Sequence, residues 1–333
     1  MIVIATFSSS IKKYIDQYYS DRSINQKTKK DENIHLGIND EVEVEDEVEV
    51  IILDIKTGIK NLVPEVLNSI NILISYELSN SEADLLKDLK AVIVPMTGLE
   101  GYDEDYFKAR SIPIYNSHCN APYVAERGMG ILMTLAGKII VHSNSLKKGN
   151  WIRSGEAGRW TTLRNKKIGI YGYGHIGKAF EQMVLPFSSE IYIINRHKQH
   201  PSYLNQVDNL EDLTKQVDIL FIAVPGNKHT FNTIGINELR HMKNGFVINV
   251  GRGPVVNQEA LLEVLEDHSL AGYGSDVWYN YPEKNEKLNP SDVDLSRFEH
   301  VVMTPHNAWN FDGPKNLVKE EIVEHLKLIM SWR

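Results

Sequence analysis

The chain has 333 residues, 42% of them hydrophobic, and a formal net charge of −8. A chain of this length is expected to form about two domains. The negative charge gives no electrostatic support for binding nucleic acid or an anionic membrane surface. The single cysteine, Cys119, excludes an internal disulfide and suits a reducing compartment.

No apolar stretch reaches the roughly 18 residues that a membrane helix needs. Residues 1–7 lack the basic region and cleavage site of a signal peptide, and they predict a first strand instead. We therefore expect a soluble cytoplasmic protein, and no metal ligands are assigned.

Residues 1–115 alternate short β-rich runs with helical or polar segments, which predicts βαβ units and a parallel sheet. The expected strands are 2–6, 48–54, 71–75, 91–95 and 112–115, and the expected helices are 8–20, 61–68 and 81–89. A polar tract from Asp21 to Asp40 precedes an alternating acidic run, Glu41 to Val50. The run is either an acidic edge strand or a solvated loop, and we favour the loop because paired like charges repel.

One long helix is expected over residues 121–141, and it is interpreted as a hinge element between domains. Asn120 suits its N-cap and Pro122 its first turn. The helix is rich in small residues, which allow another element to pack close. Residues 146–165 then predict an irregular arm. Trp151 and Trp160 in that arm either form a subunit contact or pack against the neighbouring domain.

From residue 167 the strand–helix alternation returns and predicts a second doubly wound sheet. Its expected strands are 168–171, 191–195, 218–223, 245–250, 271–275 and 300–303. The expected helices are 175–184, 209–215, 236–242 and 257–267, and a last helical segment covers Asp312–Trp332. Ligands of such sheets bind outside the carboxyl ends of the strands.

The strand at 168–171 runs into three glycines spaced G-x-G-x-x-G, followed by an amphipathic helix. Gly172 permits a tight turn, Gly174 lets the backbone approach phosphates, and Gly177 lets the helix pack close to the strand. The N–H groups at the start of the helix would face the negative charge. The pattern favours a dinucleotide site.

Two ionisable residues follow strands of the same sheet, Arg252 after 245–250 and His306 after 300–303. An arginine can clamp a carboxylate with two parallel hydrogen bonds, and a histidine exchanges protons near neutral pH. With a nicotinamide on the glycine turn, these residues suggest hydride transfer to a 2-oxo acid. Arg252 would bind and polarise the oxo acid, and His306 would protonate the forming alkoxide.

Several motifs, in this order and spacing, resemble the signatures of the D-isomer-specific 2-hydroxyacid dehydrogenase family. They are Gly172-Tyr173-Gly174-His175-Ile176-Gly177, Asn249-Val250-Gly251-Arg252-Gly253, Asp276-Val277-Trp278 and Thr304-Pro305-His306-Asn307-Ala308-Trp309. The segment from Cys119 to Glu126 matches as well. The resemblance extends from about residue 70 to the C-terminus.

The resemblance implies an α/β fold of two doubly wound domains. A Rossmann NAD(P)-binding domain, residues 119–305, would be inserted in a flavodoxin-like substrate domain, residues 1–118 and 306–333. It also implies catalysis in the cleft between the domains and a homodimer joined through the coenzyme domains.

The resemblance assigns Arg252 as the substrate arginine and His306 as the acid–base histidine. The implied substrate contacts are Thr97, Gly98 and Leu99, whose backbone N–H groups would hold the carboxylate, and Asn120, for which helix capping is the other interpretation. The implied coenzyme contacts are Gly172, Tyr173, Gly174, His175, Ile176 and Gly177 in the turn, and Val224, Thr230, Val250, Gly251 and Asp276 around the nicotinamide and its ribose.

Tyr281 departs from the family, which pairs its histidine with a glutamate at this position. A carboxylate raises the pKa of an imidazole and fixes its tautomer, whereas a tyrosine hydroxyl only orients the ring. We therefore predict a lower pKa for His306 than in relatives with the acid. Glu283 could substitute, but a solvated loop glutamate is favoured.

Formate dehydrogenases of the same superfamily also lack the acid, because formate oxidation needs no proton on the substrate. Their Cys-Asn pair resembles Cys119-Asn120 as well. A formate dehydrogenase-like activity therefore stays open as an alternative.

Two further departures concern the ligands. Glu100 replaces a glycine of the carboxylate-binding loop, so either its side chain points away or the substrate differs. Asn195 and Arg196 follow the second Rossmann strand, where an acid normally binds the ribose 2′-OH of NAD. We predict that NADP(H) is accepted and preferred over NAD(H), unless Arg196 points to solvent and discrimination is slight.

The favoured function is the NAD(P)-dependent interconversion of a small 2-oxo acid and its D-2-hydroxy acid, with glyoxylate or hydroxypyruvate as examples. A non-catalytic dinucleotide-sensing protein on the same fold is the other alternative, as in the family's corepressor branch. That branch can keep both Arg252 and His306, so turnover separates the two.

Overall fold

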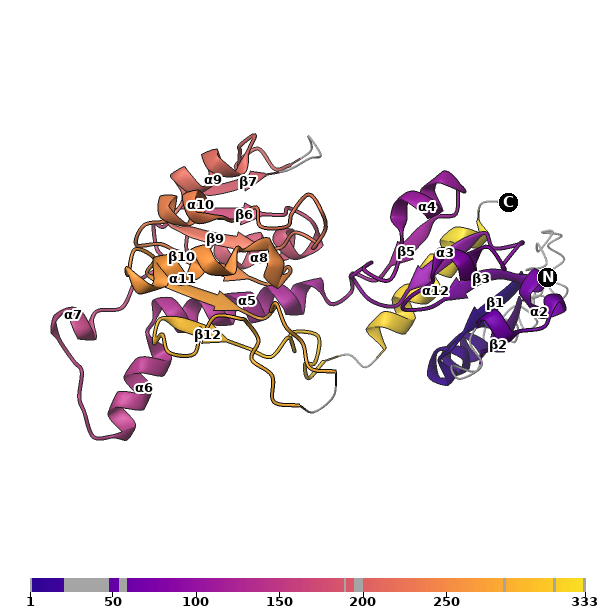
Figure 1. Cartoon of the computed structure of the whole chain (residues 1–333), viewed down its shortest axis with the longest axis horizontal. Coiled ribbons are helices and arrows are strands. Elements are labelled where there is room, and N and C mark those ends of the chain that lie inside the picture. The colour runs from indigo at the N-terminus through magenta and orange to yellow at the C-terminus, as the bar shows by residue number, and fades with distance from the viewer. Residues whose placement is uncertain are drawn as a thin grey trace, which may run out of the picture. The chain divides into compact units, whose positions relative to one another are not determined.

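The computed structural model describes residues 2–20, 48–53, 59–188, 190–194, 200–283, 286–313 and 316–331. It divides into two compact units, Met1–Cys119 with Pro314–Arg333 and Asn120–Gly313. Each unit consists of a parallel sheet with helices on its two faces (Figure 1). The acidic run at 41–47 lies outside the described residues.

The sheet of the first unit has, among the described residues, five parallel strands in the order β2-β1-β3-β4-β5. They are β1 Ile2–Thr6, β2 Val48–Ile52, β3 Ile70–Ile74, β4 Ala91–Val94 and β5 Ile114–Asn116. This is the flavodoxin-like order. The prediction of a flavodoxin-like first domain is confirmed.

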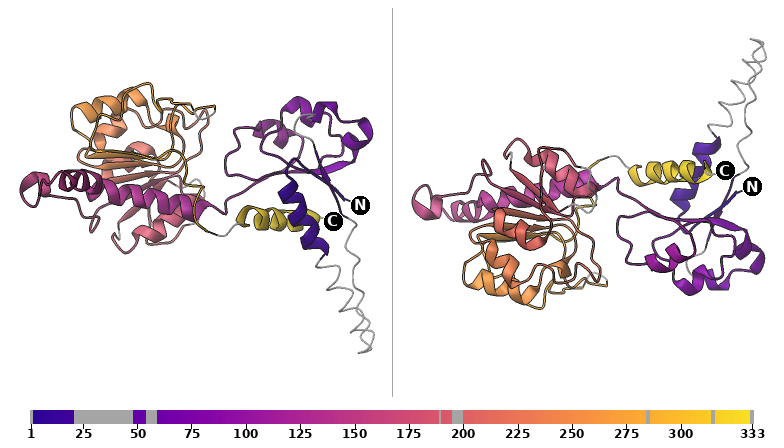
Figure 2. Two further views of the ribbon diagram at one scale, coloured as in Figure 1. Left: turned by 90° about the horizontal axis from the view of Figure 1, so that it is seen from below. Right: turned by 90° about the horizontal axis from the view of Figure 1, so that it is seen from above.

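Helices cover both faces of this first sheet. The helix of residues 9–20 and α12 (Leu317–Met330) pack side by side on one face, through Ile11, Ile15 and Leu326 (Figure 2). The other face carries the shorter elements η1 Ile59–Asn61, α2 Pro64–Ser69, α3 Asn80–Ala83 and α4 Glu104–Ala109.

Two helix predictions in this unit were inaccurate, and one further helix was not predicted. The helix expected over 81–89 is only one turn long, and the helix expected from Asp312 begins at Leu317. Helix α4 was not predicted. It begins at Asp103, whose carboxylate caps the helix by accepting a hydrogen bond from the Tyr106 N–H.

The second sheet has, within the described ranges, seven strands in the order β12-β11-β10-β9-β6-β7-β8. They are β6 Ile168–Tyr171, β7 Ile191–Ile194, β8 Asn205–Gln206, β9 Ile219–Ile222, β10 Phe246–Asn249, β11 Gly272–Ser275 and β12 Val301–Met303. Numbered along the chain, the order is that of a Rossmann sheet with one more strand at its end. The Rossmann prediction is confirmed, although the short β8 was not expected.

The helices of the second unit also form two layers. They are α5 Ala121–Ala136, α6 Ile139–Lys147, α7 Gly155–Gly158, α8 His175–Val184, α9 Leu210–Gln216, α10 Ile236–His241, η2 Gly253–Val255 and α11 Gln258–Glu266. Helices α5 and α8 cover one face of the sheet, and α9, α10 and α11 cover the other. None of the helices in the described parts of the chain is long and apolar enough to cross a membrane.

The prediction of a single helix over residues 121–141 was wrong. Helix α5 ends at Ala136, because Lys138 adopts a left-handed backbone conformation with φ of 49° and α6 then starts in a new direction. Helices α6 and α7 project from the body of the second unit (Figure 1). The irregular arm was predicted over residues 146–165, which contain α7 but only the end of α6. We refer to residues 138–161 as the arm.

Candidate active site

The glycine turn joins β6 to α8, and its three glycines occupy different surroundings. Gly172 has φ of +105°, and a Cβ there would lie 2.7 Å from the Ala223 carbonyl carbon. A Cβ on Gly177 would lie 2.2 Å from the Gly172 oxygen, so α8 packs directly on the turn. A Cβ on Gly174 would meet nothing within 4 Å. The turn is therefore closed toward the protein and open at Gly174, the N-cap of α8.

These surroundings predict opposite effects for two alanine substitutions. Gly177→Ala should destabilise the fold by about 1–3 kcal/mol, because the added methyl group overlaps backbone atoms that cannot move aside. Gly174→Ala should change stability by less than about 0.5 kcal/mol but weaken NAD(P)H binding, because its methyl group occupies the open side. Urea unfolding and fluorescence titration with NAD(P)H measure the two effects. Equal loss of stability in both variants would contradict this assignment.

Tyr173, in the glycine turn, is held in place by a carboxylate of α8. The Tyr173 hydroxyl donates to the buried Glu181 carboxylate of α8 at 3.0 Å, and the Tyr203 hydroxyl donates to the same carboxylate at 2.6 Å. Burial and the bond to Glu181 raise the pKa of Tyr173. His175 is exposed in the first turn of α8, and Ile176 packs against the core. No sequence motif indicated this role of Glu181.

Strand register brings the other expected coenzyme residues to one edge of the sheet. Tyr171 aligns with Ile222, and Asn249 aligns with both Ile222 and Ser275. The residues that follow these positions therefore adjoin at the carboxyl ends of β6, β9, β10 and β11. They are Gly172, Val224, Val250, Gly251 and Asp276.

Thr230 stabilises the loop at this edge of the sheet through side-chain hydrogen bonds. Its hydroxyl donates to the Pro225 carbonyl at 2.6 Å and accepts from the Asn227 N–H at 3.0 Å. Thr230 is buried, so it fixes the loop that follows β9. Asn195 and Arg196, on which the coenzyme preference was predicted, lie outside the described residues.

Arg252 follows β10 on a segment held by Asn249. The buried Asn249 side chain donates to the Arg252 carbonyl at 2.9 Å and accepts from the Gly251 N–H at 3.0 Å. The Arg252 guanidinium donates to the Gly251 carbonyl at 2.8 Å, and its aliphatic stem lies against Gly226. The Asn-Val-Gly-Arg-Gly motif thus contains both the arginine and the residue that orients its backbone.

His306 lies on the turn that follows β12, in a left-handed conformation with φ of 52°. Non-glycine residues in this conformation are uncommon and persist where the surroundings enforce it. The Tyr281 ring lies beside the imidazole, with ring centroids 5.2 Å apart and planes at 52°. The Tyr281 hydroxyl accepts from the Trp278 N–H at 2.8 Å, while Glu283 is exposed. The structure therefore places the Tyr281 ring next to the His306 imidazole.

The expected carboxylate loop of the first unit is tied to the end of β5. The Thr97 hydroxyl donates to the Ser117 carbonyl at 2.9 Å, and the Asn116 side chain donates to the Thr97 carbonyl at 2.7 Å. Gly98 and Leu99 are half-buried, and Glu100 is exposed. The loop is thus supported by side chains that the sequence did not single out.

Asn120 occupies the N-cap of α5, as expected, but its side chain makes no capping hydrogen bond. The preceding residues are held by Glu321, whose carboxylate accepts from the N–H groups of His118 and Cys119 at 3.0 Å. Burial alone would raise the pKa of Glu321, but these bonds and one from Ser117 hold it below its usual value. Burial raises the pKa of the Cys119 thiol, which does not suit a nucleophile.

Two features of the second unit fit a bound nicotinamide dinucleotide. The glycine turn leaves its outer side open at the N-terminus of α8, where N–H groups favour phosphate. Beside His306, the Asn307 Oδ1 atom is buried without a hydrogen-bond partner in the part of the chain that the structure describes. A buried acceptor of this kind usually has a partner, such as a ligand, an ordered water or another part of the chain.

The Rossmann order, the open glycine turn and the strand-end arginine and histidine define a dinucleotide-dependent dehydrogenase. A family model described as "D-isomer specific 2-hydroxyacid dehydrogenase, NAD binding domain" matches residues 129–308. The chain belongs to the D-isomer-specific 2-hydroxyacid dehydrogenase family, as the motifs predicted, and it is an NAD(P)-binding oxidoreductase.

Three relatives illustrate the range of the family. The chain is 30% identical to a 2-ketogluconate reductase of Gluconobacter oxydans, over 73% of this chain and 76% of the relative. It is 28% identical to a glycerate dehydrogenase of Methylorubrum extorquens, over 75% and 80%. A solved NADPH-dependent glyoxylate/hydroxypyruvate reductase of Sinorhizobium meliloti, in complex with NADP and malonate, superposes with a TM-score of 0.71 at 21% identity, over 99% of this chain and 94% of that one.

Proposed function

We propose that this enzyme reduces a small 2-oxo acid, of the size of glyoxylate or hydroxypyruvate, to the D-2-hydroxy acid. The observation that supports this most is the gathering of Arg252, His306 and the glycine turn at the carboxyl edge of one sheet. The names of the glycerate dehydrogenase and the glyoxylate/hydroxypyruvate reductase agree with such a substrate. The first unit would be the substrate domain and the second the coenzyme domain. Cys119 as sole cysteine suits the reducing cytoplasm.

In this proposal the bound coenzyme supplies the hydride to the substrate carbonyl carbon. Arg252 binds the carboxylate and the carbonyl oxygen of the oxo acid through its planar guanidinium. The protonated His306 donates its proton to that oxygen as negative charge develops there. The loop Thr97–Leu99 would hold the carboxylate. One oxo acid, one reduced coenzyme and one proton then yield one hydroxy acid and one oxidised coenzyme.

The experiment that tests this function is a panel of 2-oxo acids with NADPH and NADH, followed by coenzyme absorbance. We expect turnover of the short oxo acids, and a higher kcat/KM with NADPH because Asn195 and Arg196 replace the acid that repels a 2′-phosphate. A strong preference for NADH would overturn the coenzyme proposal. Absence of turnover with every oxo acid would overturn the function.

A formate dehydrogenase-like activity is the second candidate. It is favoured by the residue at position 281, which is a tyrosine and not an acid. Formate with NAD or NADP therefore belongs in the same panel. Formate oxidation without reduction of any oxo acid would establish this alternative in place of the first.

Tyr281 allows a prediction about pH dependence. In Tyr281→Glu, a carboxylate beside His306 should raise the imidazole pKa, because it stabilises the charged form. Reduction requires the protonated imidazole, so the alkaline limb of the kcat/KM profile should move to higher pH by the same amount. Tyr281→Phe, which adds no charge, is the control. Superimposable profiles for Tyr281→Glu and the native enzyme would contradict the prediction.

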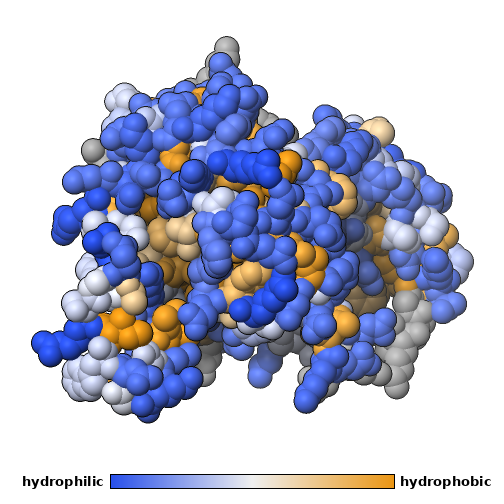
Figure 3. Space-filling view, turned by 60° about the vertical axis from the view of Figure 1, so that its left-hand side comes forward, coloured by the Kyte–Doolittle hydropathy of each residue, from blue (hydrophilic) through white to orange (hydrophobic). Residues whose placement is uncertain are grey.

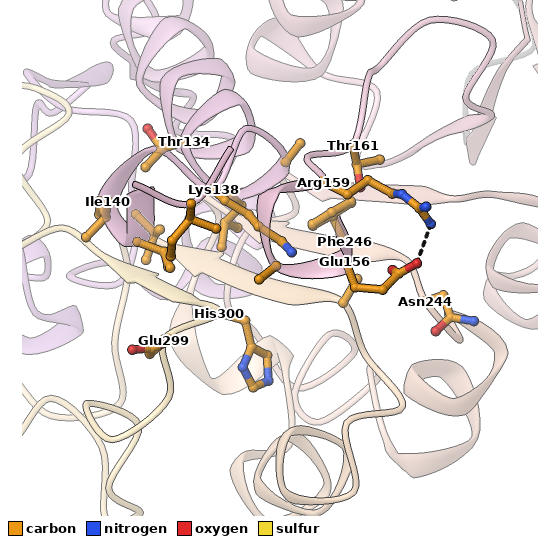
Figure 4. A pocket seen from close by; sticks show the side chains of 17 residues that line it. Thr134, Lys138, Ile140, Glu156, Arg159, Thr161, Asn244, Phe246, Glu299 and His300 are labelled. Carbon is orange, nitrogen blue, oxygen red and sulfur yellow. Dashed lines mark ion pairs between the residues drawn. The ribbon is translucent and has the colours of Figure 1, made fainter. Parts of the chain in front are cut away.

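We also propose that the enzyme is a homodimer and that the arm contacts the second copy. Trp151 and Trp160 are 72% and 60% exposed, and Ile139, Ile140 and Leu146 are exposed as well. Beside the arm lies a pocket of about 600 Å³, bordered by Lys138, Arg159 and His300, with Phe246 in its lining (Figure 4). Figure 3 shows apolar side chains in a hollow between hydrophilic ones on this side of the molecule. Exposed aromatic side chains beside an apolar hollow are typical of a protein contact.

The proposed arm contact predicts that a charge at Trp151 weakens the dimer. Trp151→Glu should shift the protein from dimer to monomer in sedimentation velocity, because a carboxylate in the interface loses its hydration. Val63→Glu changes a similarly exposed apolar residue outside the arm and should leave the dimer intact. A native protein that sediments as a monomer would overturn the proposed dimer, and an unchanged dimer in Trp151→Glu would exclude this contact.

A further inference from the structure

The chain segment that follows β5 is held by one carboxylate of α12. The Glu321 carboxylate accepts a hydrogen bond from the Ser117 hydroxyl. It also accepts from the backbone N–H groups of His118 and Cys119 at 3.0 Å, and the His118 N–H is 3.0 Å from both of its oxygens. All four residues belong to the first unit. Two parts of this unit that lie more than 200 positions apart in the sequence are therefore joined at a single side chain.

Ser117 connects this carboxylate to the loop expected to bind the substrate carboxylate. Ser117 is 4% exposed, and its carbonyl accepts from the Thr97 hydroxyl at 2.9 Å. Its N–H donates to the Met96 carbonyl at 3.0 Å, and its hydroxyl donates to Glu321. Three groups of one buried serine thus fix it between the start of the loop and α12. A shift of Ser117 would break or bend its bonds to residues 96 and 97.

The negative charge of Glu321 is stabilised by these donors rather than by the nearby His325. His325 lies one turn further along α12, with its ring centroid 5.3 Å from that of Tyr115. Burial lowers the pKa of His325, so its imidazole is largely neutral at pH 7. Burial opposes the charge of Glu321 as well, but the donors of residues 117–119 hold its pKa below the usual value. Because bonds to a charged acceptor are stronger than those between neutral groups, the charge of Glu321 strengthens its hold on the segment.

We propose that Glu321 is a positioning residue for the substrate loop, residues 97–99, and that it acts through Ser117. The proposal rests on the proposed function, in which backbone N–H groups of this loop hold the carboxylate of the oxo acid. A hydrogen bond weakens steeply when its donor is displaced or misaligned. The substrate keeps its carboxylate throughout reduction, so the loop contacts it equally before and during hydride transfer. Weakening this contact should therefore raise KM more than it lowers kcat.

Glu321→Gln tests this role, because glutamine keeps the shape but replaces one acceptor oxygen by an NH2 group that would face the N–H donors. We expect KM for the oxo acid to rise by about 10-fold to 100-fold, the usual contribution of a hydrogen bond to a charged group. The kcat should stay within about threefold of the native value. The Kd of NAD(P)H, from fluorescence titration, should not change, because the glycine turn belongs to the other unit. A smaller folded fraction would lower kcat at an unchanged KM and so would not give this pattern.

Two other variants make the test specific. Glu324→Gln is the matched control, because it makes the same substitution in the same helix at an exposed glutamate that pairs with Lys327. It should leave KM and kcat native. Ser117→Ala removes the hydroxyl between Glu321 and the loop, and it should also raise KM. Since the two residues act through one bond, the double variant should raise KM by less than the product of the single effects. Effects that multiply in full would overturn the path through Ser117.

Hydrogen exchange of the backbone amides separates this proposal from the proposed function. In Glu321→Gln the amides of residues 97–99 should exchange faster than in the native protein and in Glu324→Gln, whether or not the native enzyme reduces any oxo acid. Faster exchange confined to residues 117–119, or native exchange in both segments, would overturn the positioning role. Faster exchange of the loop with an unchanged KM would support the positioning of the loop and overturn only its proposed contact with the substrate. Absence of oxo acid turnover in the native enzyme would contradict only the proposed function.

Discussion

His306→Gln should lower kcat for 2-oxo acid reduction by about 10²-fold to 10⁴-fold, the usual contribution of a positioned general acid. Glutamine can hydrogen-bond to the substrate oxygen but cannot supply a proton near neutral pH. Glutamine is uncharged, like the neutral imidazole that it replaces, so NAD(P)H binding should persist. Stopped-flow measurement of coenzyme oxidation and fluorescence titration give the two quantities.

The pH profile adds a second test of His306. The native kcat/KM for reduction should fall at alkaline pH as the imidazole loses its proton, and this limb should be absent from His306→Gln. His268→Gln, in the exposed turn between α11 and β11, serves as the control and should retain native turnover. A His306→Gln enzyme with native kcat would require a different proton donor.

Arg252→Ala should lower kcat/KM for the oxo acid by about 10²-fold to 10⁴-fold, since two charge-assisted hydrogen bonds are each worth about 1.5–3 kcal/mol. Arg252→Lys keeps the charge but loses the planar fork that matches a carboxylate, so it should recover only part of the activity. Steady-state kinetics over a range of oxo acid concentrations separate KM from kcat.

The control for Arg252 is Arg240→Ala. This variant removes an exposed arginine of α10 that pairs with Glu263 of α11. Exposed ion pairs contribute at most about 1 kcal/mol, so its kinetics should be native. If Arg252→Ala retained kcat/KM within about threefold of the native value, Arg252 would not be the substrate arginine.

Most strands could be predicted from the sequence, because buried parallel strands are short, nearly continuous apolar runs. The expected strands at 2–6, 168–171 and 91–95 agree with β1, β6 and β4 to within one residue. The shortest elements could not be predicted in this way. Strand β8 has two residues and no apolar pattern, and it forms only because it pairs with β7.

The helix break at Lys138 also escaped prediction. A lysine in a left-handed conformation has no sequence signature of its own, and here it follows Gly137, which ends α5. The prediction that small residues of α5 allow close packing holds at Gly128 but not at Gly130, where a Cβ would meet nothing within 4 Å. A Cβ on Gly128 would lie 2.5 Å from the Phe221 ring of β9.

The sequence alone predicted the family and the two sheets, because these depend on local patterns and on motifs of adjoining residues, and the same motifs led us to propose Arg252 and His306 as the reacting side chains. It also showed that Tyr281 stands in place of an acid. Tertiary structure decided which side chains support the predicted site. Thr97 bonds to a residue 20 positions away, and Glu321 bonds to residues more than 200 positions away. Such contacts follow from the register of parallel strands and the return of the chain to the first unit, which no local pattern encodes.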